Sequence, residues 1–382
     1  MSSSQTSRQE GLDRAAEIVE IECFPTYLPL VKPLVMSTYR IDTGPALFVR
    51  LRARCGAEGW GEAPASPVMS GDTLAGMMAA INELLAPRLL GASPVDRVMI
   101  SREQRHLVHG NGGAKAAVDM ALLDLAGHIL GVRAVDLLGG AARRAARVLR
   151  LVGGSGVPEK DVEEACAIAA QGFTAFKLKV GVAPIEREAE TVRLLRDALG
   201  PDALIAADAN MGWDVSQARR FAALAAPFGL AFMEQPVAPG DMRRMAAIAA
   251  GSPVPIGADE AIHGMNDILA HVEAGAIHGV SLKTIKLGGL TPLMAAAQVA
   301  DALGLSVNLS MLMESSLASA AMIHAACAVP QLDWGLSLGN LFLTEDPVAA
   351  PIGCQDGLVR CPDGPGLGVV IDEARLRKLA AP

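Results

Sequence analysis

Hydrophobic and polar positions follow two different patterns along the chain. Before about residue 145 the pattern is mixed, and its elements are strands at 18–24 and 46–53 followed by helices at 73–90, 94–108 and 114–130. The segment 28–43 is rich in Pro, Ser and Thr and predicts a loop, and 65–72 predicts a second one. This first region is therefore expected to be an α+β unit with two polar loops.

From about residue 148 short apolar strands alternate with Ala-rich helices. The predicted strands are 148–152, 175–180, 204–208, 231–234, 255–259, 279–283, 306–310 and, more weakly, 332–336. Alternation of this kind implies parallel strands joined by crossover helices. Eight strands within about 190 residues favour a closed β/α barrel over an open sheet. No Gly-x-Gly-x-x-Gly follows a strand here, which argues against a dinucleotide-binding fold.

Composition and charge narrow the classes of protein. The 382 residues are 51% hydrophobic, a globular profile, and the net charge of −8 without any basic stripe argues against binding nucleic acid or an anionic membrane. The six cysteines form no C-x-x-C pair, so we expect a reducing cytoplasm, and no signal peptide is visible. The longest apolar stretch, 317–332, contains His324 and Pro330 and fits a buried helix better than a membrane span.

Candidate chemistry begins with Lys177 and Lys179 in the run 174–180. Residues two apart in a strand point to the same face, so the two ammonium groups are expected side by side. Their repulsion favours the loss of one proton, which is one way to obtain a basic lysine. An isolated Lys-x-Lys is more often a solvated strand edge. Here the charged residues that end the following strands favour a functional site.

Three of those residues are carboxylates on consecutive strands. Asp208, Glu234 and Asp259 each lie at the carboxyl end of a predicted strand, the end at which barrel enzymes place their active sites. Each one alone could equally cap a helix or form an ion pair. Together, three converging carboxylates would repel one another unless a cation lay among them. An all-oxygen set of this kind suits Mg²⁺, with Mn²⁺ possible.

In combination these motifs resemble the enolase superfamily, in its mandelate racemase and muconate-lactonizing-enzyme subgroup. The similar segments are Phe176-Lys177-Leu178-Lys179, Ala207-Asp208-Ala209-Asn210, Met233-Glu234-Gln235-Pro236, Ala258-Asp259-Glu260 and Leu282-Lys283, followed by Leu287-Gly288-Gly289. The resemblance implies a (β/α)₇β barrel with an α+β capping domain. The expected division is a disordered leader at 1–11, the cap at 12–145, the barrel at 146–338 and a tail at 339–382 that completes the cap.

The resemblance also implies roles for single residues. Asp208, Glu234 and Asp259 would bind Mg²⁺. Lys179 would be the base on one face of the substrate, with Lys177 adjusting its basicity, and Lys283 the acid or base on the opposite face. Orienting groups would be Asn210, Glu260 and Glu314. Among residues of the first loop region, the candidates for substrate contact are Tyr27, Lys32 and Tyr39.

The last barrel strand departs from the named activities of the subgroup. Muconate cycloisomerases typically carry a Glu a few residues after a Trp, and dipeptide epimerases an Asp-x-Asp. Here Trp334 is followed by Ser337 instead. The resemblance thus implies Mg²⁺-dependent removal of the proton next to a carboxylate through an enediolate. Isomerisation (racemisation, epimerisation or cycloisomerisation) is favoured, dehydration is the alternative, and a non-catalytic binding barrel is the alternative from another class. We expect a cytoplasmic homo-oligomer that binds a small-molecule carboxylate, and neither nucleic acid nor membrane.

Overall fold

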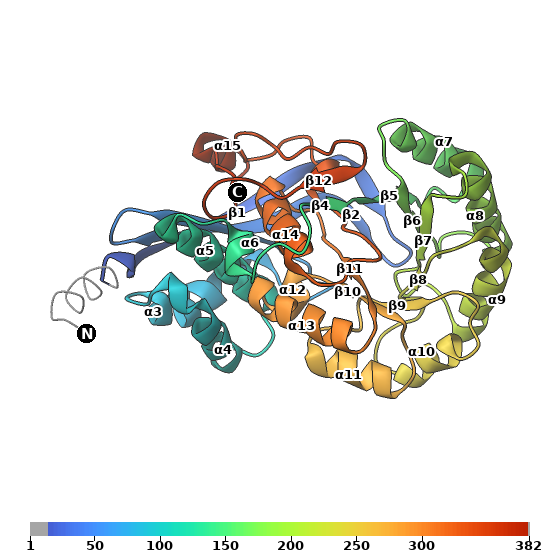
Figure 1. Ribbon diagram of the computed structural model, residues 1–382, viewed down its shortest axis with the longest axis horizontal. Coiled ribbons are helices and arrows are strands. Elements are labelled where there is room, and N and C mark those ends of the chain that lie inside the picture. The colour runs from blue at the N-terminus through green and yellow to red at the C-terminus, as the bar shows by residue number, and fades with distance from the viewer. Residues whose placement is uncertain (1–13, 381–382) are drawn as a thin grey trace.

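The computed structural model describes residues 14–380 (Figure 1). The first sheet in it has three antiparallel strands. They are β1 (Ile18–Val35), β2 (Arg40–Ala53) and β3 (Glu58–Pro64), and β2 lies in the middle of the sheet. The expected disordered leader at 1–11 lies outside the described residues.

The prediction of a loop at 28–43 is wrong, because most of that segment belongs to the β1–β2 hairpin. β1 continues to Val35 and β2 begins at Arg40, so only residues 36–39 connect them. Pro29 and Pro33 lie in β1, which is an edge strand of the sheet. An edge strand tolerates proline because a missing N–H on its outer side removes no ladder hydrogen bond. Turn-forming composition therefore indicated a loop where an edge strand lies.

The helices of the cap follow the sheet, as predicted. They are α2 (Leu74–Ala79), the π-helical η1 (Ala80–Leu85), α3 (Ala86–Leu89), η2 (Pro94–Asp96), α4 (Arg97–Leu107), α5 (Gly112–Leu130) and α6 (Ala134–Leu137). Helix α5 is buried over most of its length against β3. A Cβ added to Gly61 would lie 1.9 Å from the main-chain oxygen of Ala117. Glycine in β3 therefore permits the close approach that seats α5 on the sheet.

A curled parallel sheet of seven strands makes up the barrel. In spatial order these are β11 (Ser306–Leu309), β10 (Gly279–Leu282), β9 (Ile256–Ala258), β8 (Met233–Glu234), β7 (Leu204–Asp208), β6 (Ala175–Lys179) and β5 (Leu149–Gly153). Each strand lies within two residues of its predicted position. Six of these strands are fully or almost fully buried, whereas β5 is only partly buried. This burial explains why the strands appear in the sequence as continuous apolar runs.

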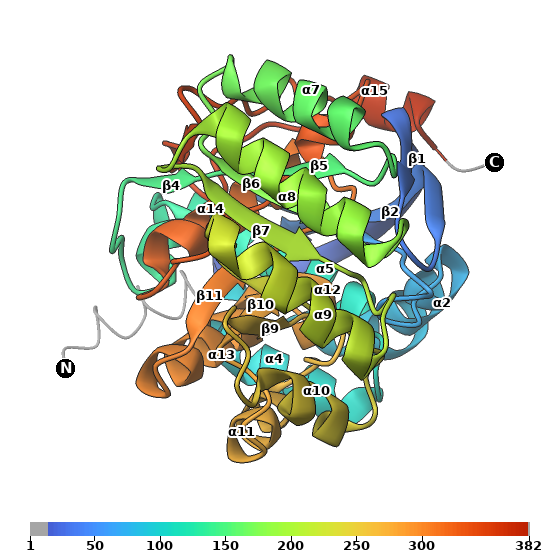
Figure 2. The same ribbon diagram turned by 90° about the vertical axis from the view of Figure 1, so that its right-hand side faces the viewer.

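Helices cover the outside of this sheet, and Figures 1 and 2 show the arc that they form around the strands. They are α7 (Pro158–Ala169), α8 (Ile185–Leu199), α9 (Val215–Ala225), η3 (Ala226–Phe228), α10 (Met242–Ala249), α11 (Met265–Glu273), α13 (Leu290–Ala302) and α14 (Ser316–Ala328). A short additional helix, α12 (Thr284–Leu287), follows β10 directly. It places the residues after Lys283 next to α5 of the cap.

The eighth position of the barrel is reduced to one bridging residue. The predicted strand 332–336 is absent from the described strands, but Leu336 forms parallel bridges to Val148, beside β5, and to Leu309 in β11. Trp334 stacks on Phe232 with ring centroids 4.0 Å apart. These rings pack with Leu149 and the small residues at the beginnings of β6 and β7 and fill the barrel at the amino ends of its strands.

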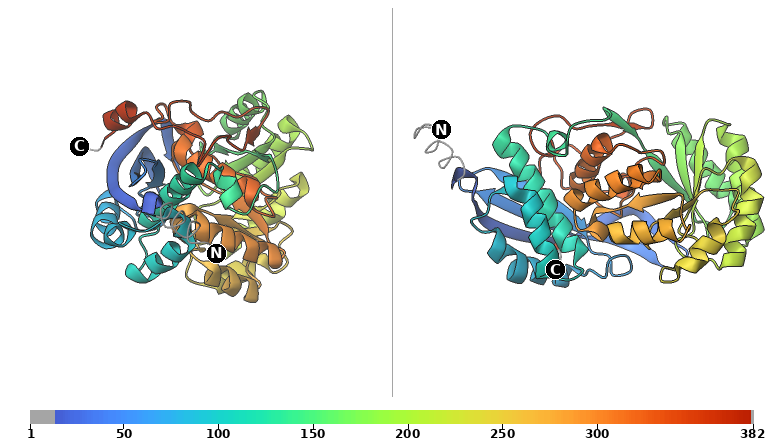
Figure 3. Two further views of the ribbon diagram at one scale, coloured as in Figure 1. Left: turned by 60° about the vertical axis from the view of Figure 1, so that its left-hand side comes forward. Right: turned by 60° about the horizontal axis from the view of Figure 1, so that its bottom comes forward.

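The tail returns to the cap. Its elements are η4 (Asn340–Phe342), β12 (Leu358–Arg360), which pairs with β4 (Ala145–Arg147), and α15 (Glu373–Lys378). Bridges join Leu343 to Leu30 and Ala380 to Thr26, so the tail lies along β1. Figure 3 shows this arrangement from two further sides.

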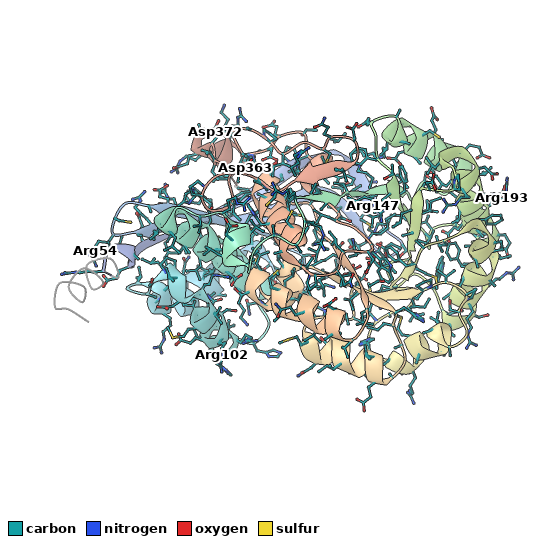
Figure 4. All side chains as sticks on the ribbon, in the orientation of Figure 1. Arg54, Arg102, Arg147, Arg193, Asp363 and Asp372 are labelled. Atoms are coloured by element: carbon teal, nitrogen blue, oxygen red, sulfur yellow. The ribbon has the colours of Figure 1, made fainter. Side chains whose placement is uncertain are left out.

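Charged side chains surround the molecule (Figure 4). Arg54 pairs with Glu17 at 2.7 Å, and Arg193 on α8 pairs with Glu190 at 2.6 Å. Exposed pairs of this kind contribute little to the stability of a fold, because water and salt screen the two charges. Between residues 14 and 380, none of the helices combines the length and the apolar character that a membrane crossing requires.

Candidate active site

Lys177 and Lys179 lie on one face of β6, as predicted, and both are buried. β6 pairs with β7 in register, so that Lys179 lies opposite Asp208. Asp208 in turn lies opposite Glu234 of β8. Neighbouring paired residues point to the same face of a parallel sheet, so the lysines and the carboxylates share the interior of the barrel.

Each predicted carboxylate accepts a hydrogen bond from a lysine. Lys179 Nζ lies 2.6 Å from Asp208 Oδ2, and Lys177 Nζ lies 2.7 Å from Glu234 Oε2. Lys283, directly after β10, contacts Asp259 Oδ2. All of these side chains are less than a tenth exposed. Buried charges without partners are strongly destabilising, so each of these lysines and carboxylates needs the partner that it has inside the barrel.

Asn210 connects the Lys179–Asp208 pair to Glu260. Its Oδ1 accepts a hydrogen bond of 2.6 Å from Lys179 Nζ, and its Nδ2 donates one of 3.0 Å to Glu260 Oε1. Asn210 has φ +41°, and Gln235, the residue after β8, has φ +34°. Left-handed backbone costs about 1 kcal/mol or more at residues other than glycine and concentrates at functional sites. Asn210 and Glu260 thus contact each other beside Lys179, and their orienting roles stay a prediction.

The carboxylates provide the oxygen donors that Mg²⁺ prefers. Glu234 Oε1 and Glu260 Oε2 are buried acceptors without a hydrogen-bond partner among the described residues. Within residues 14–380, however, no group of three His, Cys, Asp or Glu side chains is arranged to hold a metal ion, and a lysine contacts one oxygen of each of the three carboxylates. The oxygens of Asp208, Glu234 and Asp259 therefore suit a divalent cation. To bind it, these carboxylates would rotate away from their lysine partners.

Two carboxyl groups beside this cluster bind their protons unusually tightly. Burial raises the pKa of Glu260 to about 7, and the negative charges of Asp259 and Asp208 act in the same direction. Burial also raises the pKa of Glu314 to about 7, although a hydrogen bond from the Leu312 amide opposes the shift. Both groups therefore change their charge near neutral pH.

Lys283 and Asp259 hold each other in their charged forms. Burial acts to lower the pKa of Lys283, but the charges of Asp259 and Glu260 outweigh it, and the pKa lies well above its ordinary value. Burial likewise acts to raise the pKa of Asp259, but Lys283 and Lys286 hold it far below its usual range. In this arrangement Lys283 is an ammonium ion and therefore a proton donor.

The tip of the β1–β2 hairpin covers the barrel mouth. We call residues 28–43 of this hairpin the lid. Ser37 Oγ donates a hydrogen bond of 2.7 Å to the main-chain oxygen of Ala209. Tyr39 lines the cavity beneath the lid. The pKa of its phenol lies well above the ordinary value, and burial is the largest cause of this shift. Tyr27, 43% exposed, and Lys32, which pairs with Glu164 at 2.6 Å, do not line this cavity.

The cavity comprises about 620 Å³ of space free of protein atoms, counting the space at its mouth. Barrel strands supply its ionic side, with Lys177, Lys179, Asp208 and Lys283. Ser337, three residues after Trp334, also lines it. Lid and loop residues add Met36, Tyr39, Ile41, Met69, Leu312, Met313 and Phe342. The remaining lining residues are Leu149, Arg150, Leu151, Asn210, Ser310, Met311 and Leu338.

Two residues of the site were missed in the sequence. Lys286 Nζ lies 2.6 Å from Asp259 Oδ1, so Asp259 has two ammonium partners. Gln235 Oε1 accepts a hydrogen bond of 2.9 Å from the Asp259 amide and fixes the backbone there. Lys286 follows Lys283 by three residues, the spacing that places two side chains on one face of a helix, and this spacing could have revealed it.

Comparison with known proteins matches nearly the whole chain. Residues 18–139 match the family model described as the N-terminal domain of mandelate racemase / muconate lactonizing enzyme. Residues 160–375 match the model described as enolase C-terminal domain-like.

Individual relatives extend over similar lengths. Muconate cycloisomerase 1 of Pseudomonas putida is 32% identical over 370 residues, which cover 95% of this chain and 97% of the relative. N-succinyl-L-Arg/Lys racemase of Bacillus cereus is 28% identical, with 95% of this chain and 98% of the relative covered. The solved structure of muconate lactonizing enzyme from Pseudomonas fluorescens complexed with muconolactone superposes with a TM-score of 0.92 at 30% identity, covering 96% of this chain and 100% of the other.

Proposed function

The chain belongs to the mandelate racemase / muconate lactonizing enzyme family of the enolase superfamily, and from this premise we propose that it removes and returns the proton next to a substrate carboxylate. It is an isomerase, in keeping with relatives named as a cycloisomerase and a racemase. We further propose that proton transfer uses two lysines and a divalent cation, Mg²⁺ or Mn²⁺.

The observation that carries this proposal is the order of charged residues around the barrel. Lys179 ends β6 and Lys283 follows β10. On the strands between them, Asp208 ends β7, Glu234 ends β8 and Asp259 follows β9. A substrate held against the carboxylate side by a cation would have one lysine on each flank. One amine would then face each side of the carbon that loses its proton.

Asp208, Glu234 and Asp259 would hold the cation. When bound, a divalent cation neutralises the negative charge that develops on a substrate carboxylate as the neighbouring proton leaves. Glu260 and Asn210 would support this set from behind through their hydrogen bond. The buried oxygens of Glu234 and Glu260 that lack a partner support the assignment.

The lysines carry out the proton transfers. Lys179 in its neutral form would take the proton from one face, oriented by its contact with Asn210. Lys283, held as an ammonium ion by Asp259, would deliver a proton to the other face. Lys177 would remain paired with Glu234 and supply positive charge beside the base. The lid excludes water from the reacting groups.

The test is exchange of the substrate proton with solvent deuterium in single-lysine variants. For a chiral carboxylate, Lys179→Ala should abolish exchange in one stereoisomer and retain some in the other, and Lys283→Ala should show the reverse preference. Each loss should be about 10²- to 10⁴-fold. Lys160→Ala, at an exposed position of α7, is the matched control and should leave exchange unchanged.

Other outcomes identify the alternatives. Equal loss for both stereoisomers in both variants would contradict the two-base assignment. Release of water without exchange into the recovered carboxylate would indicate a dehydratase. Ligand binding with neither exchange nor turnover would indicate a non-catalytic barrel.

A further inference from the structure

A second cavity lies where the cap meets the barrel. Its lining comes mainly from helices α4 and α5 of the cap and from α12 and α13 of the barrel, which contact one another. It shares no lining residue with the cavity beneath the lid. The space free of protein atoms is about 890 Å³, counting the space at the mouth. This hollow is therefore large enough for a small ligand and separate from the candidate active site.

All titratable side chains that line this second cavity are basic. They are Arg105, His109, Lys115, His263 and Lys286. Within residues 14–380, no Asp or Glu is part of the lining. The chain as a whole carries a net charge of −8, so this hollow has the opposite sign to the molecule around it. A hollow lined by charges of one sign attracts ligands of the other sign, and these ligands are anions.

Two of the basic side chains already have their partners. Lys286 Nζ lies 2.6 Å from Asp259 Oδ1 and 3.0 Å from the main-chain oxygen of Ser281. His263 Nε2 donates a hydrogen bond of 3.1 Å to the main-chain oxygen of Glu260. Lys286 and His263 therefore form the wall on the barrel side and leave the binding of an anion to residues of the cap.

Lys115 is buried in the cap with one hydrogen-bond partner. It is 7% exposed, and its Nζ donates a hydrogen bond of 2.6 Å to the main-chain oxygen of Val108. An ammonium group can donate three hydrogen bonds, so two of its N–H groups remain for a ligand. Burial lowers the pKa of Lys115, and the charge of Arg105 acts in the same direction. An anion between these two cations would relieve their repulsion.

The nearest carboxylate does not fill this role. The charge of Asp72 opposes the shift in the pKa of Lys115, but Asp72 is not part of the cavity lining. Its Oδ2 accepts a hydrogen bond of 2.8 Å from the Gly113 amide at the start of α5. Arg105, one residue of α4 that is exposed, lines the same hollow as Lys115. The two cations thus face a space in which the chain supplies no counter-charge.

We propose that this cavity binds a phosphate group, carried either by inorganic phosphate or by a phosphate ester. The guanidinium of Arg105 can donate two hydrogen bonds to phosphate oxygens, and Lys115 supplies the second positive charge. Helix α5 extends for 19 residues from Gly112, which lines the cavity, so the positive end of its dipole adds to the attraction. The assignment does not depend on the proposed proton transfer.

The first experiment measures the ligand class by calorimetric titration of the full chain. The probes are inorganic phosphate, glycerol 3-phosphate and dimethyl phosphate, at constant ionic strength, without divalent cations and at about pH 8, where the first two carry two charges. We expect Kd for dimethyl phosphate, which has one charge, to be at least roughly tenfold higher. The tighter of the two dianions identifies the source of the group. Equal affinity for dimethyl phosphate, or binding of neither dianion, would overturn the proposal.

The second experiment locates the site with variants. Arg105→Gln should raise Kd for the tighter dianion by roughly tenfold or more. Arg102→Gln is the matched control, because Arg102, labelled in Figure 4, is exposed on the same helix and does not line the cavity. Lys115→Met should weaken binding as well. If it does not fold, Arg105→Glu takes its place and should abolish binding.

The lysines beneath the lid are the competing site for a phosphate group. Lys179→Ala should leave Kd for the dianion unchanged, since Lys179 does not line the second cavity. Weaker binding in Lys179→Ala together with an unchanged Kd in Arg105→Gln would place the phosphate in the candidate active site and overturn the proposal. Deuterium exchange into the substrate is measured separately, so failure of the proposed function leaves this result standing.

Discussion

Ser37 at the lid tip is hydrogen-bonded to the main-chain oxygen of Ala209, the residue that follows Asp208. A second hydrogen bond, of 3.0 Å, reaches the main-chain oxygen of Asn210. Two glycines make room for Ser37, because a Cβ on Gly181 or Gly212 would lie 2.9 or 2.7 Å from its own Cβ. The lid is thus fastened to the backbone that presents the ionic groups.

Gly212→Ala should break the hydrogen bonds between Ser37 and the main chain of Ala209 and Asn210. The added methyl group would collide with Ser37, so we expect amide hydrogen exchange at the lid tip to rise by about tenfold or more, with a higher KM. Ser37→Gly alone removes the hydroxyl that makes both hydrogen bonds, and it should raise exchange at the lid tip in the same way. Gly353→Ala, at a position with open space around it, is the control. Unchanged amide hydrogen exchange at residues 36–39 in Gly212→Ala would show that the Ser37 hydrogen bonds do not hold the lid tip in place.

Lys286→Met should weaken metal binding without abolishing folding. Lys286 Nζ contacts Asp259 Oδ1 and also lies 3.0 Å from the main-chain oxygen of Ser281, so it orients Asp259 from behind. Supporting contacts of this kind are worth roughly 10- to 100-fold in metal affinity. Calorimetric titration with Mg²⁺ measures the effect directly. Equal affinity in the variant and the parent would show that Lys283 alone suffices to position Asp259.

Glu314→Gln should flatten the pH dependence of stability. The folded chain raises the pKa of Glu314 from 4.5 to about 7 by burial, so it retains a proton that the unfolded chain releases. The contribution of Glu314 to the free energy of unfolding is full below about pH 4.5 and is lost as pH rises to 7, by roughly 3 kcal/mol at most. Urea unfolding of both proteins at pH 5 and pH 8 measures this. If the parent and Glu314→Gln lost the same free energy of unfolding between pH 5 and pH 8, the prediction would be contradicted.

Gly257→Ala and Trp334→Phe should compensate each other. A Cβ on Gly257 would lie 2.8 Å from Trp334 Cζ3, so the alanine overpacks the barrel floor and should destabilise the fold by about 1–3 kcal/mol. Trp334→Phe removes the atoms in the way but leaves space. The double variant should therefore be less destabilised than the sum of the single variants, as a denaturant cycle measures. If the two changes in the free energy of unfolding were strictly additive, the alanine at position 257 would not be in contact with Trp334.

Much of the barrel could be predicted because its strands are buried on both sides. β7 begins and ends at the predicted residues, Leu204 and Asp208, since a continuous apolar run ends there in a charged residue. The same signal located the three carboxylates and the lysines. Residues that lie at strand ends are thus accessible to sequence reasoning, because their position in the chain fixes their position in the barrel.

Contacts made across the fold were not accessible in this way. Tyr27 and Tyr39 were equal candidates in the sequence, and only the extension of β1 and β2 into a long hairpin places Tyr39 in the cavity and leaves Tyr27 exposed. The partner of Lys32 is Glu164 of α7, more than a hundred residues away. Such pairings depend on how the cap lies over the barrel, which local patterns do not encode.

The single bridging residue at the eighth position has a consequence for how the chemistry can change. Leu336 joins the two edge strands by isolated bridges, whereas every other neighbouring pair in the ring forms a ladder between two strands. Ser337 follows it at once and faces the cavity. Main-chain hydrogen bonds from Ser337 N to Leu309 O and from Leu336 N to Arg147 O fix the backbone there independently of the side chain, so this side chain can be replaced with little disturbance to its neighbours. The seam of the barrel is therefore a position at which evolution, or an engineer, can exchange a side chain that faces the cavity while the lysines and carboxylates stay in place.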